Sequence, residues 1–139
     1  MVVMESSGCV REVMSTPVLT AYVDESLWEA WQLLSVAGLR HLAVLRADGT
    51  CLGVLNDRSV LGAGPDPVGR LQANRISDVM ALVPDVHITP TTPVWMAAEM
   101  MVDRTIEALT VLDEGRLVGI VTESDLVRWV ARQGRELAS

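Results

Sequence analysis

The stretch GIVTESD, residues 119–125, decides the fold of this chain, because a second copy of it, GVLNDRS, occupies residues 53–59. Each copy closes an apolar run that is typical of a strand and opens a stretch that is typical of a helix. The shared pattern indicates an internal repeat, and the polar positions at which the copies differ raise the question of function.

The repeat extends beyond these stretches. VREVM at 10–14 matches ISDVM at 76–80, an offset of 66 residues, and SLWEAWQLL at 26–34 matches PVWMAAEMM at 93–101 with one residue gained. Repeated units of this kind form a core between copies. We expect a first repeat at 9–64, a connector at 65–75, a second repeat at 76–133 and a C-terminal tail at 134–139.

Each copy has the pattern of a β-α-β-β-α unit. A β-prone stretch, 19–23 or 86–89, precedes an amphipathic helix, and two apolar runs around an Asp48-Gly49 or Glu114-Gly115 turn then predict a hairpin. A second helix follows each hairpin. The Gly- and Pro-rich segment 62–75 is expected to be an irregular connector.

Capping signals agree with the helical periodicity. Ser26 with Glu29 resembles a capping box, Gly38 is placed to end the first helix, and Thr92 before Pro93 predicts a cap followed by a first-turn proline. The inward stripes are Leu27, Ala30, Trp31 and Leu34 in copy one, and Val94, Ala97, Ala98 and Met101 in copy two.

Composition narrows the class of protein. A chain of 139 residues, half of them apolar, is long enough for one core of ordinary size, so we expect one compact unit. The net charge of -7 disfavours nucleic acid as a partner. Cys9 and Cys51 are too few for a disulfide scaffold, and the sequence contains neither a signal peptide nor an apolar run of about 20 residues. We therefore expect a cytoplasmic protein without a membrane span.

These features resemble a tandem pair of cystathionine-β-synthase (CBS) domains, also called a Bateman module. The resemblance depends on the Val13-Met14 and Val79-Met80 pairs, the hairpin Val111–Gly119 and the G-h-h-T-x-x-D ending Gly119–Asp125, and it spans about Val10 to Val130. It implies an α+β fold of two β-α-β-β-α repeats with pseudo-two-fold symmetry, packed into one module.

The resemblance also implies a function. CBS pairs generally bind adenosine-containing ligands (AMP, ADP, ATP, S-adenosylmethionine or NAD(H)) in the cleft between repeats, and they often form homodimers. The expected protein is a non-catalytic regulatory module without a catalytic cofactor, which signals to an unknown regulated protein.

Thr122 and Asp125 admit two interpretations. They cap a helix, or Asp125 binds the ribose diol while Thr122 contacts phosphate, as the resemblance implies. Their counterparts, Asn56 and Ser59, keep the cap but lose the carboxylate, so we expect one ligand site, in copy two. This hypothesis needs an open Asp125. If the carboxylate is instead paired with an arginine and the space beside it is filled, the ligand hypothesis fails and only a role in assembly remains.

Further ligand contacts follow from the resemblance. Arg40 and His41 are candidates for phosphate contact, with a solvated strand end as the alternative. Arg104 and Arg128 are expected on the surface. The candidate adenine pocket consists of Met80, Val86, His87, Ile88 and Val111, all of which also suit a core.

Tryptophans mark a candidate dimer interface. Trp28 and Trp95 occupy equivalent positions off the inward stripes, next to Met96 in copy two, and Trp129 is a candidate for the same surface. The alternative is that these rings cover the core between the repeats.

Three other functions compete. The sequence contains none of the GxxxxGK[ST], HExxH, CxxC or GxSxG motifs, so we expect no enzyme. A redox or metal sensor would use Cys51 with His41 or His87, although a buried cysteine is the commoner arrangement and we expect no metal site. A ligand-free dimerisation and docking scaffold differs only in leaving Asp125 unused.

Overall fold

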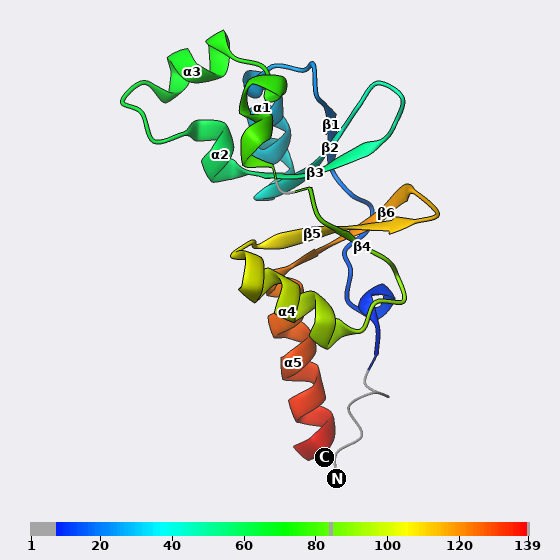
Figure 1. Ribbon diagram of the computed structural model, residues 1–139. Helices are drawn as coiled ribbons and strands as arrows, with labels where there is room; N and C mark the ends of the chain where they lie inside the picture. The colour runs from blue at the N-terminus through cyan, green and yellow to red at the C-terminus, as the bar shows by residue number, and fades with distance from the viewer. Residues whose placement is uncertain (1–7, 84, 139) are drawn as a thin grey trace. The chain divides into compact units, whose positions relative to one another are not determined.

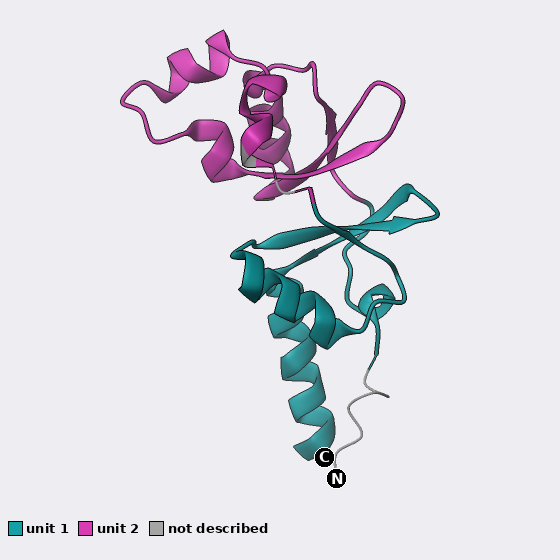
Figure 2. Cartoon of the chain, viewed as in Figure 1, with its two compact units in different colours: residues 1–17, 86–139 teal, residues 18–85 magenta. Residues whose placement is uncertain are grey.

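The structure is a computed structural model that describes residues 8–83 and 85–138. It divides the chain into two compact units and not the single unit that the composition predicts, one of residues 18–85 and one of residues 1–17 with 86–139 (Figures 1 and 2). Each unit contains a three-stranded sheet with helices packed against it, so the predicted α+β fold is confirmed.

The unit of residues 18–85, called unit 2, has the strand order β1-β2-β3. β1 pairs parallel with β2, and β2 pairs antiparallel with β3 around the predicted hairpin. Its strands are β1 (Thr20–Tyr22), β2 (His41–Leu45) and β3 (Cys51–Asn56), and its helices are α1 (Leu27–Ala37), α2 (Asp57–Leu61), α3 (Pro67–Ala73) and a 3-10 helix at Ile76–Leu82.

The other unit, unit 1, has the same arrangement with the strand order β4-β5-β6. Helices α4 and α5 pack against each other and against this sheet (Figure 1). The strands are β4 (His87–Ile88), β5 (Ala108–Asp113) and β6 (Arg116–Thr122), and the helices are a 3-10 helix at Val10–Glu12, α4 (Val94–Arg104) and α5 (Glu123–Ala138).

The compact units do not coincide with the sequence repeats, because the leading segments are exchanged. The Val10 N–H donates to the Thr92 carbonyl at 2.8 Å, and Ser15 exchanges two backbone bonds with Ile120 of β6. The leading segment of copy one thus packs in the unit built from the body of copy two. The segment 76–83 correspondingly joins the core of unit 2.

The helix ends mostly follow the predicted signals. The Ser26 hydroxyl accepts from the Glu29 N–H at 3.0 Å, and α1 ends at Gly38 with φ of 65°. The predicted cap at Thr92 is wrong. Pro93 is the N-cap of α4, and the Thr92 hydroxyl instead accepts from the Thr89 N–H at 3.1 Å, since it closes the preceding turn.

The connector is more ordered than the sequence analysis predicts. The Asp66 carboxylate accepts from the Gly69 N–H at 3.0 Å and Pro67 is in the first turn, so residues 67–73 form α3. The predicted tail is also helical, because α5 continues to Ala138; Ser139 is outside the described residues. Among residues 8–83 and 85–138, no helix combines the length and apolar character that a membrane crossing needs.

Candidate functional site

The candidate site is at the start of α5, where Thr122 and Asp125 form a reciprocal cap. The Thr122 N–H donates to Asp125 Oδ2 at 2.9 Å, and the Asp125 N–H donates to Thr122 Oγ1 at 3.3 Å. The capping interpretation of the T-x-x-D motif is therefore correct. It accounts for Oδ2 of the carboxylate and leaves the partners of Oδ1 to be explained.

Two side chains occupy Oδ1 of Asp125. The Ser15 hydroxyl donates to it at 3.0 Å, and Arg128 Nη2 donates to it at 2.6 Å as an ion pair. Ser15 is held in place by its backbone bonds to Ile120. Asp125 is 4% exposed and is the one buried charged residue in the part of the chain that the structure describes.

Asp125 is therefore paired with Arg128 and not open, so the ligand hypothesis now requires that the exposed Arg128 side chain leave Oδ1 when a ligand binds. Arg128 is on the surface, as expected, with its side chain 63% accessible, and it also turns back onto the carboxylate. The spacing of three residues on one helix places these two side chains together. This spacing was a signal for the pair in the sequence.

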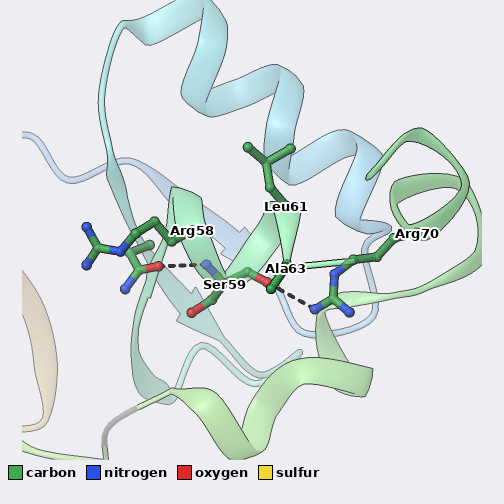
Figure 3. Close-up of a pocket in the computed structure, with 7 residues that line it drawn as sticks. Arg58, Ser59, Leu61, Ala63 and Arg70 are labelled. Carbon is green, nitrogen blue, oxygen red and sulfur yellow. Dashed lines mark hydrogen bonds between the residues drawn. The ribbon is translucent and has the colours of Figure 1, made fainter. Parts of the chain in front are cut away.

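The equivalent position in unit 2 has a cap without a charge. The Asn56 side chain accepts from the Ser59 N–H at 2.8 Å at the start of α2. This helix has five residues and stops at Gly62, and Arg70 of α3 donates to the carbonyls of Ser59 and Val60 at its end (Figure 3). Unit 2 thus satisfies its helix ends without a buried carboxylate.

The candidate adenine residues are distributed over both units. Val86, His87, Ile88 and Val111 belong to unit 1, whereas Met80 packs against the core of unit 2. In unit 1 the residue equivalent to Met80 is Met14, whose side chain contacts Gly119 of β6. Met80 therefore does not pack with the other four residues, and Met14 has its place in unit 1; a role for Met80 beside a purine stays a prediction.

The other adenine candidates are largely core residues. Val111 is fully buried and Ile88 is 5% exposed, so both act in the core, as the alternative interpretation expects. His87 is half-buried and its Nδ1 hydrogen-bonds to the hydroxyl of Thr110, its cross-strand neighbour. A role for these residues beside a purine stays a prediction.

Arg40 and His41 belong to unit 2. The Arg40 side chain is largely exposed and is 3.7 Å from the Asp57 carboxylate, which fits the solvated strand end. Arg40 and Asp57 contribute to a pocket of about 260 Å³ beside α1, and His41 begins β2 opposite Asn56. A phosphate-binding role for the two residues stays a prediction.

The tryptophans differ in burial. Trp95 on α4 is 53% exposed, with the neighbouring Met96 also exposed, and Trp28 on α1 is 39% exposed. Trp129 of α5 instead packs partly against the core of unit 1. Trp28, Trp95 and Met96 are therefore available on the surface of their units.

Cysteine and histidine are poorly placed for a joint sensor. Cys51 is buried opposite Leu45, at the far end of the β2–β3 ladder from His41. His87 is in the other unit. Within the described part of the chain, no three His, Cys, Asp or Glu side chains are placed to hold a metal ion.

Comparison with known proteins identifies the family. The CBS domain profile matches twice, at residues 10–66 and 76–132. A CBS domain-containing protein of Dictyostelium discoideum is 32% identical over 128 residues, which cover 85% of this chain and 88% of that protein. The chain belongs to the CBS domain family, as a tandem pair. By contrast, its match covers only 14% of the A-adding tRNA nucleotidyltransferase of Aquifex aeolicus, at 29% identity.

Solved structures agree on the fold. The CBS domain pair of protein MJ0100, in complex with 5′-methylthioadenosine and S-adenosyl-L-methionine, has a TM-score of 0.74 and 25% identity, covering 88% of this chain and 98% of that one. CBSX2 in complex with AMP has a TM-score of 0.75 and 21% identity, covering 91% and 98%.

Proposed function

We propose that this CBS pair is a regulatory module that binds an adenosine-containing ligand through Asp125 and signals to a partner protein. Two relatives of the same fold are seen with AMP or with S-adenosyl-L-methionine and its thioether analogue. The carrying observation in this chain is the burial of a charged carboxylate at a position where capping alone does not require one.

Burial of a carboxylate is costly unless other groups compensate for its charge. Asn56 shows that a neutral side chain caps the equivalent helix with a bond of 2.8 Å. The additional charge at Asp125 therefore needs a purpose other than the cap. A ribose offers two neighbouring hydroxyls, and a carboxylate accepts both through charge-assisted bonds.

The geometry separates the two oxygens of Asp125. Oδ2 is engaged by the Thr122 N–H, which the helix start holds in place, whereas Oδ1 is engaged by the side chains of Ser15 and Arg128. Side chains rotate away at small cost compared with backbone. The ribose diol would therefore replace donors at Oδ1 while the cap is retained.

The first test is a search for a bound molecule. The purified chain is denatured and the released small molecules are measured by mass spectrometry, and the ligand-free protein is then titrated calorimetrically with AMP, ADP, ATP, S-adenosylmethionine and NADH. We expect one adenosine compound to bind, at about one per chain. If none binds more tightly than about 1 mM, the sensor function is wrong and the scaffold remains.

A second candidate function, homodimerisation, is favoured by the outer faces of α4 and α5. The outer face of α4 carries Trp95 and Val102 with the acidic Glu99 and Asp103. The exposed part of α5 carries Val127, Val130 and Leu137 along one side and Arg132 and Arg135 along another, together with Glu123 and Glu136. Opposite charges beside apolar faces suit packing of α4 of one copy against α5 of a second copy.

Sedimentation equilibrium tests this dimer. We expect the dissociation constant of the dimer to rise at least about tenfold in Trp95→Ala, because truncation of a buried aromatic anchor is costly, and to rise with salt because opposite charges meet. Trp28→Ala reports whether α1 takes part. A monomeric wild-type chain at about 100 μM would contradict the proposal.

A further inference from the structure

The cluster of Ser15, Asp125 and Arg128 is present in one unit only, although every position has a counterpart. At the offset of 66 residues, Ser15 corresponds to Ala81, Asp125 to Ser59 and Arg128 to Gly62. In unit 2 these three positions therefore carry a methyl group, a hydroxyl and a hydrogen, and the guanidinium near Ser59 is that of Arg70 of α3. In contrast, the cap itself is retained in both units.

The carboxylate and the arginine are both replaced at the equivalent positions of unit 2, which indicates that Asp125 and Arg128 act together. Arg128 Nη2 is 2.6 Å from Asp125 Oδ1, the shortest of the bonds to this carboxylate, yet most of the arginine side chain is in contact with solvent. The exposed guanidinium can leave Oδ1 and become hydrated, whereas the buried carboxylate cannot. Arg128 is thus the movable partner of the pair.

Displacement of Arg128 by a ribose diol separates the guanidinium from its anion, because a diol is neutral. A ligand without a phosphate supplies no replacement anion. A phosphorylated adenosine compound does, and a guanidinium binds phosphate with two parallel hydrogen bonds. Arg128 therefore weakens the binding of a neutral nucleoside and strengthens the binding of a nucleotide.

We propose that Arg128 determines ligand specificity at the Asp125 site, by occupying the carboxylate in the free protein and pairing with the ligand's phosphate in the complex. This inference rests on the proposed function of Asp125. It specifies the ligand class as an anionic adenosine nucleotide, in preference to adenosine or a thioether nucleoside.

The experiment compares AMP and adenosine by calorimetry in the wild-type chain, Arg128→Ala and Arg128→Gln. The wild type binds AMP at least about tenfold more tightly than adenosine. In both variants adenosine binds about 3- to 10-fold more tightly than to the wild type, because its competitor is gone, and AMP binds about 3- to 10-fold more weakly. The preference for AMP therefore falls by about 10- to 100-fold.

Arg104→Ala is the matched control, because Arg104 is an exposed arginine of the same unit at the end of α4. It removes the same charge, and the ratio of the two affinities stays at its wild-type value. Thermal unfolding of each variant establishes that the protein is folded at the temperature of the titration.

The outcomes separate this inference from the proposed function. If Arg128→Ala and Arg128→Gln change the affinities for AMP and adenosine by the same factor, Arg128 is not a specificity residue, while the Asp125 site stands. If neither the wild type nor the variants bind either compound, the proposed site itself is wrong. Tighter binding of adenosine together with weaker binding of AMP in the variants supports both the Asp125 site and the role of Arg128 in specificity.

Discussion

The starts of α5 and α2 solve the same structural problem with different side chains. Thr122 and Asn56 each accept a hydrogen bond from the N–H three residues later, at 3.3 and 2.8 Å. Only α5 adds a buried carboxylate, Asp125, where α2 has Ser59. The comparison shows that capping is a requirement of both units, whereas the buried charge is a property of one.

The largest expected effect is on ligand affinity, which should depend on Asp125 of α5 and not on Ser59 of α2. Asp125→Ala should weaken binding of the adenosine ligand by roughly 2–4 kcal/mol, or about 30- to 1,000-fold, because both charge-assisted bonds to the ribose are lost. Ser59→Ala should change the affinity less than about twofold. Calorimetric titration of both variants checks this, with Asp125→Asn as a second variant that keeps the size of the side chain. Equal effects in the two units would contradict a single site.

The next effect concerns protein stability and the position at which α2 stops whereas α5 continues. Gly62, at the position equivalent to Arg128, has φ of 71° and ψ of 178° and a Cβ there would be 2.5 Å from Arg70 Nε. Because essentially only glycine adopts this backbone conformation, Gly62→Ala should lower the free energy of unfolding by about 2 kcal/mol. Denaturant unfolding measures it, and Gly64→Ala in the same loop, where a Cβ meets open space, is the control. Equal losses of unfolding free energy in Gly62→Ala and Gly64→Ala would contradict backbone strain at position 62.

A smaller effect on stability is expected at the helix caps that the two units share. Asn56→Ala and Thr122→Ala should each lower the free energy of unfolding by about 1 kcal/mol, because each removes one helix cap. Chemical denaturation of the two variants under identical conditions provides the comparison. A cost confined to one unit would show that the caps are not equivalent.

The smallest effect is expected at the hairpin turns. Donation by the Thr50 N–H, at 2.9 Å, lowers the pKa of Asp48 from its ordinary value of 3.8. Since the folded-state pKa is depressed, the stabilisation by this bond is present above the ordinary pKa and is lost as the pH falls through the folded value. An NMR titration of the side-chain carboxyl should show this lowered pKa, and Thr50→Pro should raise it. A value at or above 3.8 in the wild type would contradict the contact.

Local signals in the sequence predicted most secondary structure correctly. The bonds of Ser26 and the left-handed Gly38 are determined by residues three or four positions apart, so their spacing was sufficient. The same holds for the hairpin turn at Glu114 and Gly115, both of which have positive φ. The glycine and proline content of 62–75 predicts an irregular connector, whereas Asp66-Pro67 is the helix-start signal that forms α3.

The candidate site was only half predictable. Thr122 and Asp125 follow from the motif, and the surface position of Arg128 is as expected, but its pairing with Asp125 was not predicted although the spacing of three residues allows it. Ser15 was not predictable, because it is 110 residues from Asp125 along the chain. The same exchange of leading segments places Met80 in unit 2 and Met14 at the equivalent place in unit 1, which the sequence does not indicate.

The sequence by itself determined the repeat, the order of helices and strands within each repeat, and the caps at Ser26, Asn56 and Thr122, because these depend on neighbouring residues and on the periodicity of apolar side chains. Only the tertiary structure decided which leading segment packs in which unit, and therefore which donors surround Asp125. An offset of 66 residues is the same whether a segment packs on its own copy or on the other. The choice depends on long-range packing, which leaves no periodic trace in the sequence.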